Sequence, residues 1–71
     1  MGVVTNLPEL REKHGLTQQQ LAHFLGVSRQ TINSVERGRF EPSLLLALRM
    51  ASFFARPVEE IFTLDEALKP R

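Results

Sequence analysis

The sequence contains no cysteine, which excludes disulfide bonds and cysteine-based zinc sites as the means of stabilising this short chain. We expect the 71 residues of the chain, residues 1–71, to form a single domain. A domain this small buries only roughly 60% of the surface that its unfolded form exposes. Its stability must therefore come from close packing, or from a second subunit.

Long apolar runs are also missing. No stretch approaches the ~20 apolar residues that cross a bilayer. The start of the chain, MGVVTNLPEL, lacks the basic region and apolar segment of a secretory signal. We therefore expect a cytoplasmic protein that does not associate with membranes.

Groups that carry catalysis are scarce. His14 and His23 are the only histidines, and no spacing gathers carboxylates around either of them. An active site or metal site needs such convergence. We therefore expect no enzyme activity, no metal and no cofactor, and a chain of this length leaves little room for a separate ligand domain.

The net charge is only +1, but the charges are segregated along the chain. Residues 28–40 contain Arg29, Arg37 and Arg39 against one acid, Glu36. The C-terminal region has acids with no base among them, namely Glu59, Glu60, Asp65 and Glu66. A short arginine-rich window also occurs by chance on solvated helices, so it indicates nucleic-acid binding only together with a motif.

Capping signals predict where the first helix lies. Asn6, with Glu9 at the third position after it, is typical of a helix N-terminus. Pro8 in the first turn agrees with that start, and Gly15 follows at a position where glycine often ends a helix. The sequence therefore predicts a helix over residues 7–14.

Two further helices follow in close succession. Thr17, with a glutamine three residues later, predicts a second helix that Gly26 ends. Ser28 predicts the cap of a third helix that extends to Arg37. The connection between the two helices is only Leu-Gly-Val-Ser, and a short turn with glycine is what a helix-turn-helix requires.

An ordinary helical hairpin is the alternative to this interpretation. The third helix has only Ile32 and Val35 as large apolar residues, so most of its surface is left for polar groups. Those groups are Arg29, Gln30, Asn33, Ser34 and Arg37. Such a polar outer face favours the DNA-binding interpretation.

The second half of the chain predicts two more helices. Pro42 and Ser43 indicate the start of a fourth helix over residues 44–54. Pro57 indicates a short fifth helix over residues 58–62. Short extended segments at Val3-Val4 and at residues 62–64 could pair as a two-stranded ribbon, although a loop fits them equally well.

The apolar arc of the fourth helix is too wide for one small core. Its core positions are expected to be Ala47, Met50, Ala51 and Phe54. Leu46 and Phe53 then lie on one flank and Leu48 on the other. We interpret one flank as a dimer surface; the alternative is that the first helix, the fifth helix and the tail cover both flanks.

Two stretches carry a resemblance to a known family. They are GLTQQQLAHFLGVSRQTINSVERGRFEPS and LALRMASFFARPVEEIF, and together they lie within Leu7 to Phe62. The chain resembles the Cro/C1-type (XRE) helix-turn-helix family, especially its compact members of the cytolysin-repressor type. The resemblance implies an all-α, five-helix, lambda-repressor-like domain without catalytic activity, in which terminal strands flank the helices.

The resemblance also implies how the chain works. The helix-turn-helix, about residues 17–37, would place its third helix in the major groove of double-stranded DNA. The C-terminal part, about residues 44–66, would join two copies. We therefore expect a homodimeric transcriptional regulator, a repressor, on a roughly palindromic operator. An antitoxin or adaptor on the same fold is the alternative.

Family members usually join the first and third helices by a partly buried ion pair, at positions that match Arg11 and Glu36. The resemblance therefore makes this pair structural and excludes Glu36 from DNA contact. Two positions depart from the family pattern. Ala55 stands where relatives often end the fourth helix with glycine, and Leu45 stands where a polar residue is more usual.

A recognition helix presents its N-terminal residues to base edges. Side-chain amides form hydrogen bonds with adenine, and arginine forms them with guanine or a phosphate. A threonine methyl group packs against the methyl group of thymine. The expected base contacts are Arg29, Gln30, Thr31 and Asn33. The expected backbone contacts are Thr17, Gln18, Ser28, Ser34, Arg37 and Arg39. The dimer-interface candidates are Leu46, Phe53, Ile61, Phe62 and Leu64.

Overall fold

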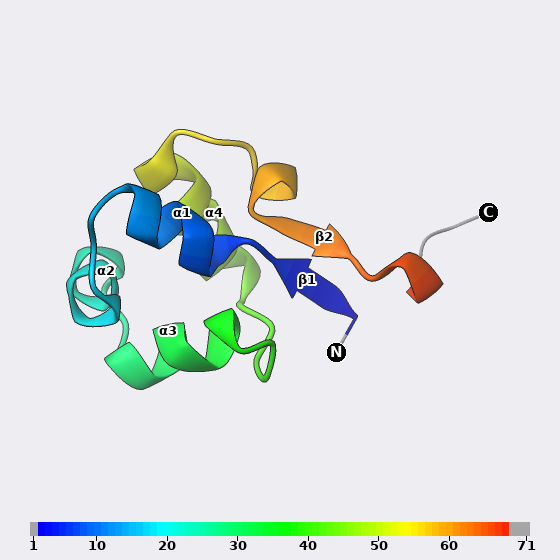
Figure 1. Ribbon diagram of the computed structural model, residues 1–71, viewed down its shortest axis with the longest axis horizontal. Helices are drawn as coiled ribbons and strands as arrows, with labels where there is room; N and C mark the ends of the chain where they lie inside the picture. The colour runs from blue at the N-terminus through cyan, green and yellow to red at the C-terminus, as the bar shows by residue number, and fades with distance from the viewer. Residues whose placement is uncertain (1, 69–71) are drawn as a thin grey trace.

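Residues 2–68 are described by a computed structural model of the chain. Four α-helices form most of the described molecule, and a ribbon of two short strands extends from one side of them (Figure 1). In order these elements are β1 (Val3–Thr5), α1 (Leu7–Lys13), α2 (Gln18–Leu25), α3 (Arg29–Glu36), α4 (Leu44–Phe54), the 3₁₀ turn η1 (Val58–Glu60), β2 (Phe62–Leu64) and the 3₁₀ turn η2 (Glu66–Leu68). No helix within these residues has the length and apolar character needed to span a membrane.

Local capping chemistry builds α2 and α3 as the sequence predicts. The Thr17 hydroxyl accepts a hydrogen bond from the Gln20 amide, and the Gln20 side chain accepts one from the Thr17 amide. Gly26 ends α2 in the left-handed conformation, with φ of 71°, which only glycine adopts without strain. Ser28 then caps α3 by accepting from the Thr31 amide at 3.1 Å. The tight helix-turn-helix connection is therefore confirmed.

The start of α1 differs from the prediction. Within residues 2–68 the Asn6 side chain caps no backbone amide, because Asn6 has φ of −106° and ψ of 19° rather than the extended conformation of a capping residue. The Thr5 hydroxyl takes that role, since it accepts from the Leu7 amide at 3.1 Å. It also donates to the Ile61 carbonyl at 2.9 Å. The predicted Asn6–Glu9 cap is therefore wrong, and the end of β1 starts the helix instead.

The region after α4 also needs correction. The expected fifth α-helix over residues 58–62 is a single 3₁₀ turn, η1, in which the Ile61 amide bonds to the Val58 carbonyl. The Ile61 carbonyl accepts from the Asn6 amide at 3.1 Å, which directs the chain into β2 after one turn. The described chain therefore contains four α-helices rather than five.

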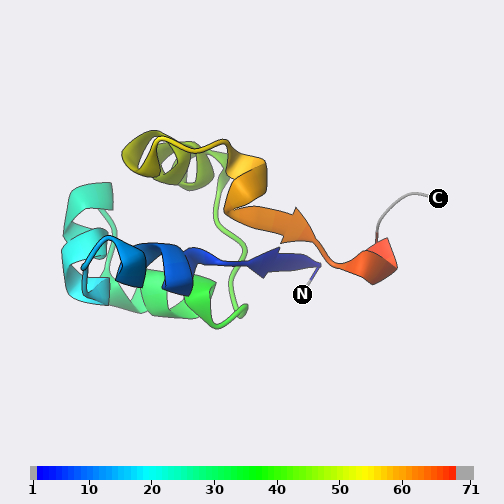
Figure 2. The same ribbon diagram turned by 45° about the horizontal axis from the view of Figure 1, so that its top comes forward.

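The two strands form the predicted ribbon. β1 and β2 are antiparallel, with Val3 opposite Leu64 and Thr5 opposite Phe62. The ribbon projects from one side of the helices, and α4 lies in a separate layer from α1 and α3 (Figure 2). The first and last thirds of the chain are thus joined by backbone hydrogen bonds.

One apolar core lies between these layers. Its buried members are Leu7, Leu10, Leu21, Ala22, Leu25, Ile32, Val35, Leu46, Met50, Phe54 and Ile61. Ala47, Met50 and Phe54 of α4 are buried as expected, whereas Ala51 is only half-buried. Leu46, placed on a flank by the sequence analysis, lies in the core instead. The wide apolar arc of α4 therefore fills the core on one side and leaves Leu48 exposed on another.

Ala55 ends α4 in an unusual conformation. Its φ of 55° and ψ of 46° are left-handed, a conformation that glycine adopts without strain. Alanine in this conformation is strained by roughly 1–2 kcal/mol, because its Cβ approaches the following carbonyl oxygen. The chain therefore makes the same helix end as a glycine would, at a cost in stability.

Replacing Ala55 by glycine is expected to stabilise the domain. Release of the strain exceeds the extra freedom that glycine has in the unfolded chain, about 0.4–1 kcal/mol. We expect a net gain of about 0.5–1 kcal/mol and a Tm higher by roughly 2–8 °C in thermal unfolding. Ala51→Gly, in the right-handed interior of the same helix, is the matched control and is expected to lose about 1 kcal/mol. Equal destabilisation by both changes would contradict the strain at Ala55.

Candidate nucleic-acid interface

The face formed by α2 and α3 brings most of the predicted DNA contacts together. α3 lies along one edge of the molecule and α2 lies beside its start (Figure 1). Ile32 and Val35, at 0% and 2% exposure, anchor α3 to the core. The exposed residues of this face are Thr17, Ser28, Arg29, Gln30, Arg37 and Arg39, and the half-buried ones are Gln18, Thr31, Asn33 and Ser34.

A shallow hollow lies beside α3 on this face. It is lined by Ser28, Gln30, Thr31, Ser34, Arg39 and Phe40. Phe40 is not among the residues that the sequence analysis selected, although it directly follows Arg39 in the basic window. Its side chain is 47% exposed. This face of α2 and α3 therefore has an aromatic edge next to its polar groups.

Ser28 and Thr31 are already hydrogen-bonded to each other at the start of α3. Their hydroxyl oxygens are 2.9 Å apart, and the Ser28 oxygen also accepts from the Thr31 amide. One hydroxyl hydrogen is used between them, because a hydroxyl has a single hydrogen to donate. The other remains free to donate to an oxygen of a ligand. This pair can therefore make one such donation rather than two.

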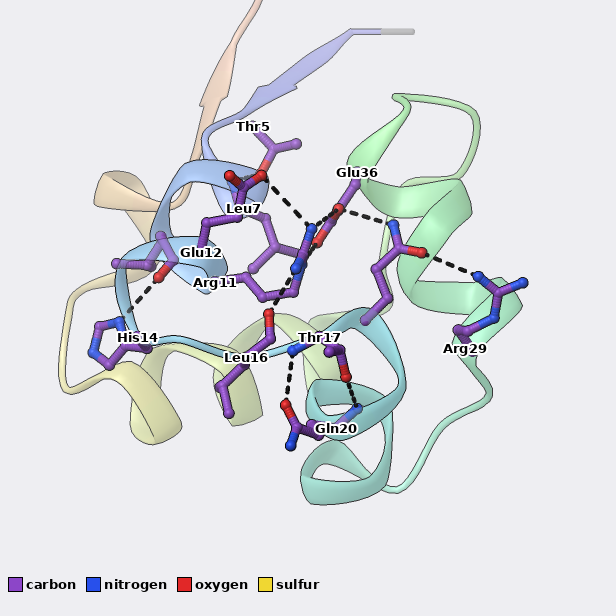
Figure 3. Close-up of polar contacts among 12 residues, drawn as sticks. Thr5, Leu7, Arg11, Glu12, His14, Leu16, Thr17, Gln20, Arg29 and Glu36 are labelled. Carbon is purple, nitrogen blue, oxygen red and sulfur yellow. Dashed lines mark hydrogen bonds and ion pairs between the residues drawn. The ribbon is translucent and has the colours of Figure 1, made fainter.

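A partly buried ion pair connects α1 to the end of α3 (Figure 3). Arg11 Nε lies 2.6 Å from Glu36 Oε2, and Arg11 Nη2 donates to Glu36 Oε1 at 3.2 Å. The two side chains are only 13% and 4% exposed. Arg11 Nη1 also donates to the Leu16 carbonyl at 2.7 Å, just before α2. One guanidinium thus holds three segments of the domain.

The pair also fixes the protonation of Arg11. Its hydrogen bond to Glu36 raises the pKa of the guanidinium above its ordinary value, and burial offsets part of that rise. A group with a raised pKa stabilises the fold below its unfolded pKa and loses that contribution only as pH rises through the folded value. The Arg11 contribution is therefore kept throughout the neutral and mildly alkaline range.

Gln18, expected to contact DNA, has a partner inside the protein. Its Nε2 donates to Glu36 Oε1 at 3.0 Å. Its Oε1 accepts from Arg29 Nη1 at 3.4 Å. This link could not be predicted from the sequence, because nothing in the local pattern pairs the start of α2 with both ends of α3.

Two of the expected dimer-interface residues are internal. Ile61 is 1% exposed and Leu46 is 6% exposed, so both belong to the core of this chain and offer no surface to a second copy. Phe62 is half-buried. Phe53 and Leu64, at 39% and 48% exposure, remain accessible. The burial of Ile61 follows from its position between η1 and β2.

An exposed aromatic contact lies between α2 and α4. The rings of Phe24 and Phe53 are stacked with centroids 5.4 Å apart, and Phe24 is 59% exposed. Phe24 is not among the residues predicted from the sequence. This contact joins the outer sides of the two helices and leaves most of the Phe24 ring accessible.

Comparison with known proteins identifies the family. The sequence profile of the helix-turn-helix family matches residues 8–61, which extend from the first turn of α1 to just past η1. The chain belongs to this family, of the Cro/C1 type. A transcriptional regulator of helix-turn-helix type from Methanothermobacter thermautotrophicus is 51% identical over 63 residues, which are 87% of this chain and 91% of that protein.

Two solved structures share the fold. The restriction-modification controller protein C.AhdI from Aeromonas hydrophila matches with a TM-score of 0.70 and 37% identity, over 76% of this chain and 82% of that one. The SOS-response transcriptional repressor LexA from Eubacterium rectale matches with a TM-score of 0.77 and 27% identity, over 93% and 69%. The helix-turn-helix chain is thus a DNA-binding transcriptional regulator and not an enzyme.

Removing one partner of the Arg11–Glu36 pair is expected to destabilise the helix-turn-helix domain strongly. Glu36→Met leaves a nearly buried guanidinium without its charge partner, at a cost of about 3–5 kcal/mol. The double replacement Arg11→Met with Glu36→Met leaves no buried charge, so it is expected to be more stable than Glu36→Met alone. Urea unfolding followed by circular dichroism compares the variants. A double variant less stable than the single one would contradict this interpretation.

Proposed function

We propose that the chain is a sequence-specific transcriptional repressor that binds a roughly palindromic operator as a homodimer, with α3 in the major groove. The observation that supports this most is that α3 has an apolar buried side and a polar exposed side. Its apolar residues, Ile32 and Val35, are buried, while its N-terminal half presents polar side chains to solvent. The name of LexA, a repressor, supports the choice of repression.

The proposed base readers lie on the first half of α3. Gln30 is exposed and Asn33 is half-buried, and each carries an amide that pairs bidentately with adenine N6 and N7. Arg29 addresses a guanine or a phosphate, and Thr31 contacts a thymine methyl group or a backbone oxygen. A carboxylate at this surface would repel DNA, and Glu36 is withdrawn from it by burial.

The proposed backbone contacts surround these readers. Thr17 and Gln18 lie at the N-terminus of α2, where free amides and the helix dipole attract phosphate. The remaining backbone contacts are proposed for Ser28, Ser34, Arg37 and Arg39. Such contacts fix the register of the protein on DNA without reading its sequence.

A dimer is proposed because one short helix covers too few bases for useful specificity. Two recognition helices about 34 Å apart read successive major grooves of one palindrome. Among the original interface candidates, Phe53, Phe62 and Leu64 retain surface that a second copy can cover. The proposed interface therefore lies at the end of α4 and along β2.

Gln30→Ala is expected to blur one position in each half of the operator. Loss of a bidentate amide contact weakens binding by about 1–3 kcal/mol. Selection of bound DNA from a random pool, with wild type and variant side by side, measures both effects. The wild type is expected to enrich two inverted half-repeats. Enrichment of the same motif by the variant would show that Gln30 reads no base, and enrichment of a single half-repeat would contradict the dimer.

Arg39→Ala is expected to weaken binding to all duplexes alike. Loss of one phosphate contact lowers the slope of log affinity against log salt by about one unit. Arg56→Ala is the matched control, because it removes the same charge from the end of α4, where Arg56 pairs with Glu60. Titrations of random duplex DNA at several salt concentrations give the slopes. A wild type with no measurable affinity would favour the adaptor function instead.

A further inference from the structure

We propose that a hollow between α3 and α4 binds a small organic acid, with its carboxylate on Arg49 and its apolar part against Phe40 and Leu45. The two helices lie in separate layers, and residues 37–43 connect them (Figure 2). The hollow between them has a volume of about 210 Å³ and is open to solvent. Its other lining residues are Val27, Thr31, Ser43 and Leu46.

The lining has the composition of a small-molecule site. Such sites are mostly apolar and carry a few polar groups that fix the orientation of the ligand. Four of the seven lining residues are apolar, among them Phe40 at 47% and Leu45 at 60% exposure. The volume lies below the roughly 300–1,000 Å³ of pockets for drug-sized molecules. The hollow therefore suits a smaller ligand that covers these two exposed side chains.

Arg49 supplies the charge of the hollow. Its Nη1 donates to the Leu25 carbonyl at 3.4 Å, which is long for a hydrogen bond. Within residues 2–68 Arg49 forms no ion pair, whereas Arg11 and Arg56 each pair with a glutamate. A guanidinium has five N–H donors in a planar fork that matches a carboxylate. Arg49 therefore has donors left for the carboxylate of a ligand.

The position of Arg49 gives the ligand a direction. Its guanidinium lies at the turn between α2 and α3, since it contacts the Leu25 carbonyl and lies 3.7 Å from where a Cβ on Gly26 would be. Leu45 is one helical turn earlier on the same side of α4. The carboxylate thus lies at the turn, and the apolar part of the ligand extends toward the N-terminus of α4.

Leu45 is the lining residue that departs from the family pattern, in which a polar residue is more usual at this position. Its 60% exposure shows that the core of the described chain does not cover it. A ligand that covers Leu45 removes apolar surface from water, which favours binding. The ligand must therefore carry an apolar group as well as a charge, which distinguishes it from inorganic phosphate.

The hollow shares two lining residues with the DNA-facing side of α3. Thr31 and Phe40 also line the hollow that contains Gln30 and Arg39. A ligand against α4 therefore covers part of Thr31, which is proposed above to contact a thymine methyl group or a backbone oxygen. This consequence rests on that proposed function: the acid weakens binding to the operator, and the operator weakens binding of the acid by the same factor.

Titration of ¹⁵N-labelled protein with hexanoate tests the site directly. Hexanoate carries a chain long enough to span the one helical turn, about 5.4 Å, between Arg49 and Leu45. We expect saturable shifts of the amide signals of Val27, Phe40, Leu45 and Arg49, with a dissociation constant of about 1 mM for so small a ligand. Shifts that do not saturate, or that lie elsewhere in the protein, would overturn the proposal.

Two control ligands separate the charge from the apolar chain. Acetate has the carboxylate without the chain, and hexanol has the chain without the carboxylate. Each is expected to bind about 10-fold more weakly than hexanoate, or worse, because each loses one of the two contributions. Inorganic phosphate is expected to behave like acetate. Binding of acetate or phosphate as strong as that of hexanoate would show a general anion site and overturn the proposal.

Two variants with matched controls locate the ligand. Arg49→Met removes the guanidinium and is expected to weaken hexanoate binding about 10-fold. Arg56→Met, just after the same helix, is expected to leave it unchanged. Leu45→Gln is expected to weaken binding about 3-fold, whereas Leu44→Gln, at an exposed leucine outside the hollow, is not. Urea unfolding checks that the variants are folded. Equal effects of each variant and its control would overturn the proposal.

Affinity for the operator selected by the wild type gives a second readout. We expect saturating hexanoate to lower this affinity about 5-fold in the wild type and to have no effect in Arg49→Met. Sodium chloride at the same ionic strength is the control for screening. Arg49→Met itself is expected to keep the salt slope of the wild type. A slope lower by about one unit would show that Arg49 holds a DNA phosphate, which would overturn the proposal.

The two experiments distinguish failure of the site from failure of the proposed function. The titration contains no DNA, so it decides whether the acid binds even if the wild type enriches no motif from random DNA. Enrichment of a motif without saturable hexanoate binding would leave the proposed function intact and overturn the site. Saturable binding with unchanged affinity for the operator would overturn the coupling to DNA.

Discussion

The carboxylate of Glu36 is the group around which the helix-turn-helix is organised. It is 4% exposed and accepts hydrogen bonds from Arg11 and Gln18, which come from α1 and α2. A buried carboxylate is costly unless it is paired and hydrogen-bonded, so α3 has one favourable position relative to both neighbours. Arg11 adds the Leu16 carbonyl to the same cluster, which fixes the entry to α2 as well. The placement of α3 against α1 and α2 thus depends on one buried charge.

The ribbon of β1 and β2 connects the first and last described segments of the chain, as the ion pair connects the helices. Thr5 accepts from the first amide of α1 and donates to the Ile61 carbonyl, so β1, α1 and η1 are joined at one side chain. Ile61 in turn fills the core and is 1% exposed. In a domain with a small apolar core and no disulfide, such long-range hydrogen bonds limit the motion of the first and last described segments. The stability of α3 therefore depends partly on residues far from it.

The range of each interaction explains what could be predicted from the sequence. The caps at Thr17 and Ser28 act over three residues, so α2 and α3 could be located correctly. The cap of α1 could not, because it depends on a bond between residues 56 positions apart. Helical periodicity likewise placed Leu46 on a flank of α4 rather than in the core, because it does not show which neighbouring elements cover that flank. The inward amide of Gln18 depends on a carboxylate 18 positions away, which only the resemblance to the family had marked as buried.

The electrostatics of the surface follow from the same arrangement. An acid at the end of the helix proposed to contact DNA has the wrong sign for that contact, yet the fold needs Glu36 there. Arg11 neutralises it from one side, and the amide of Gln18 separates it from Arg29 and the solvent. The exposed charges of this face, Arg29 and Arg37 among them, are then all basic, while the acids at residues 59, 60, 65 and 66 belong to η1, η2 and the segment between them. A net charge of +1 is therefore compatible with DNA binding, because attraction to phosphate depends on where charges lie rather than on their sum.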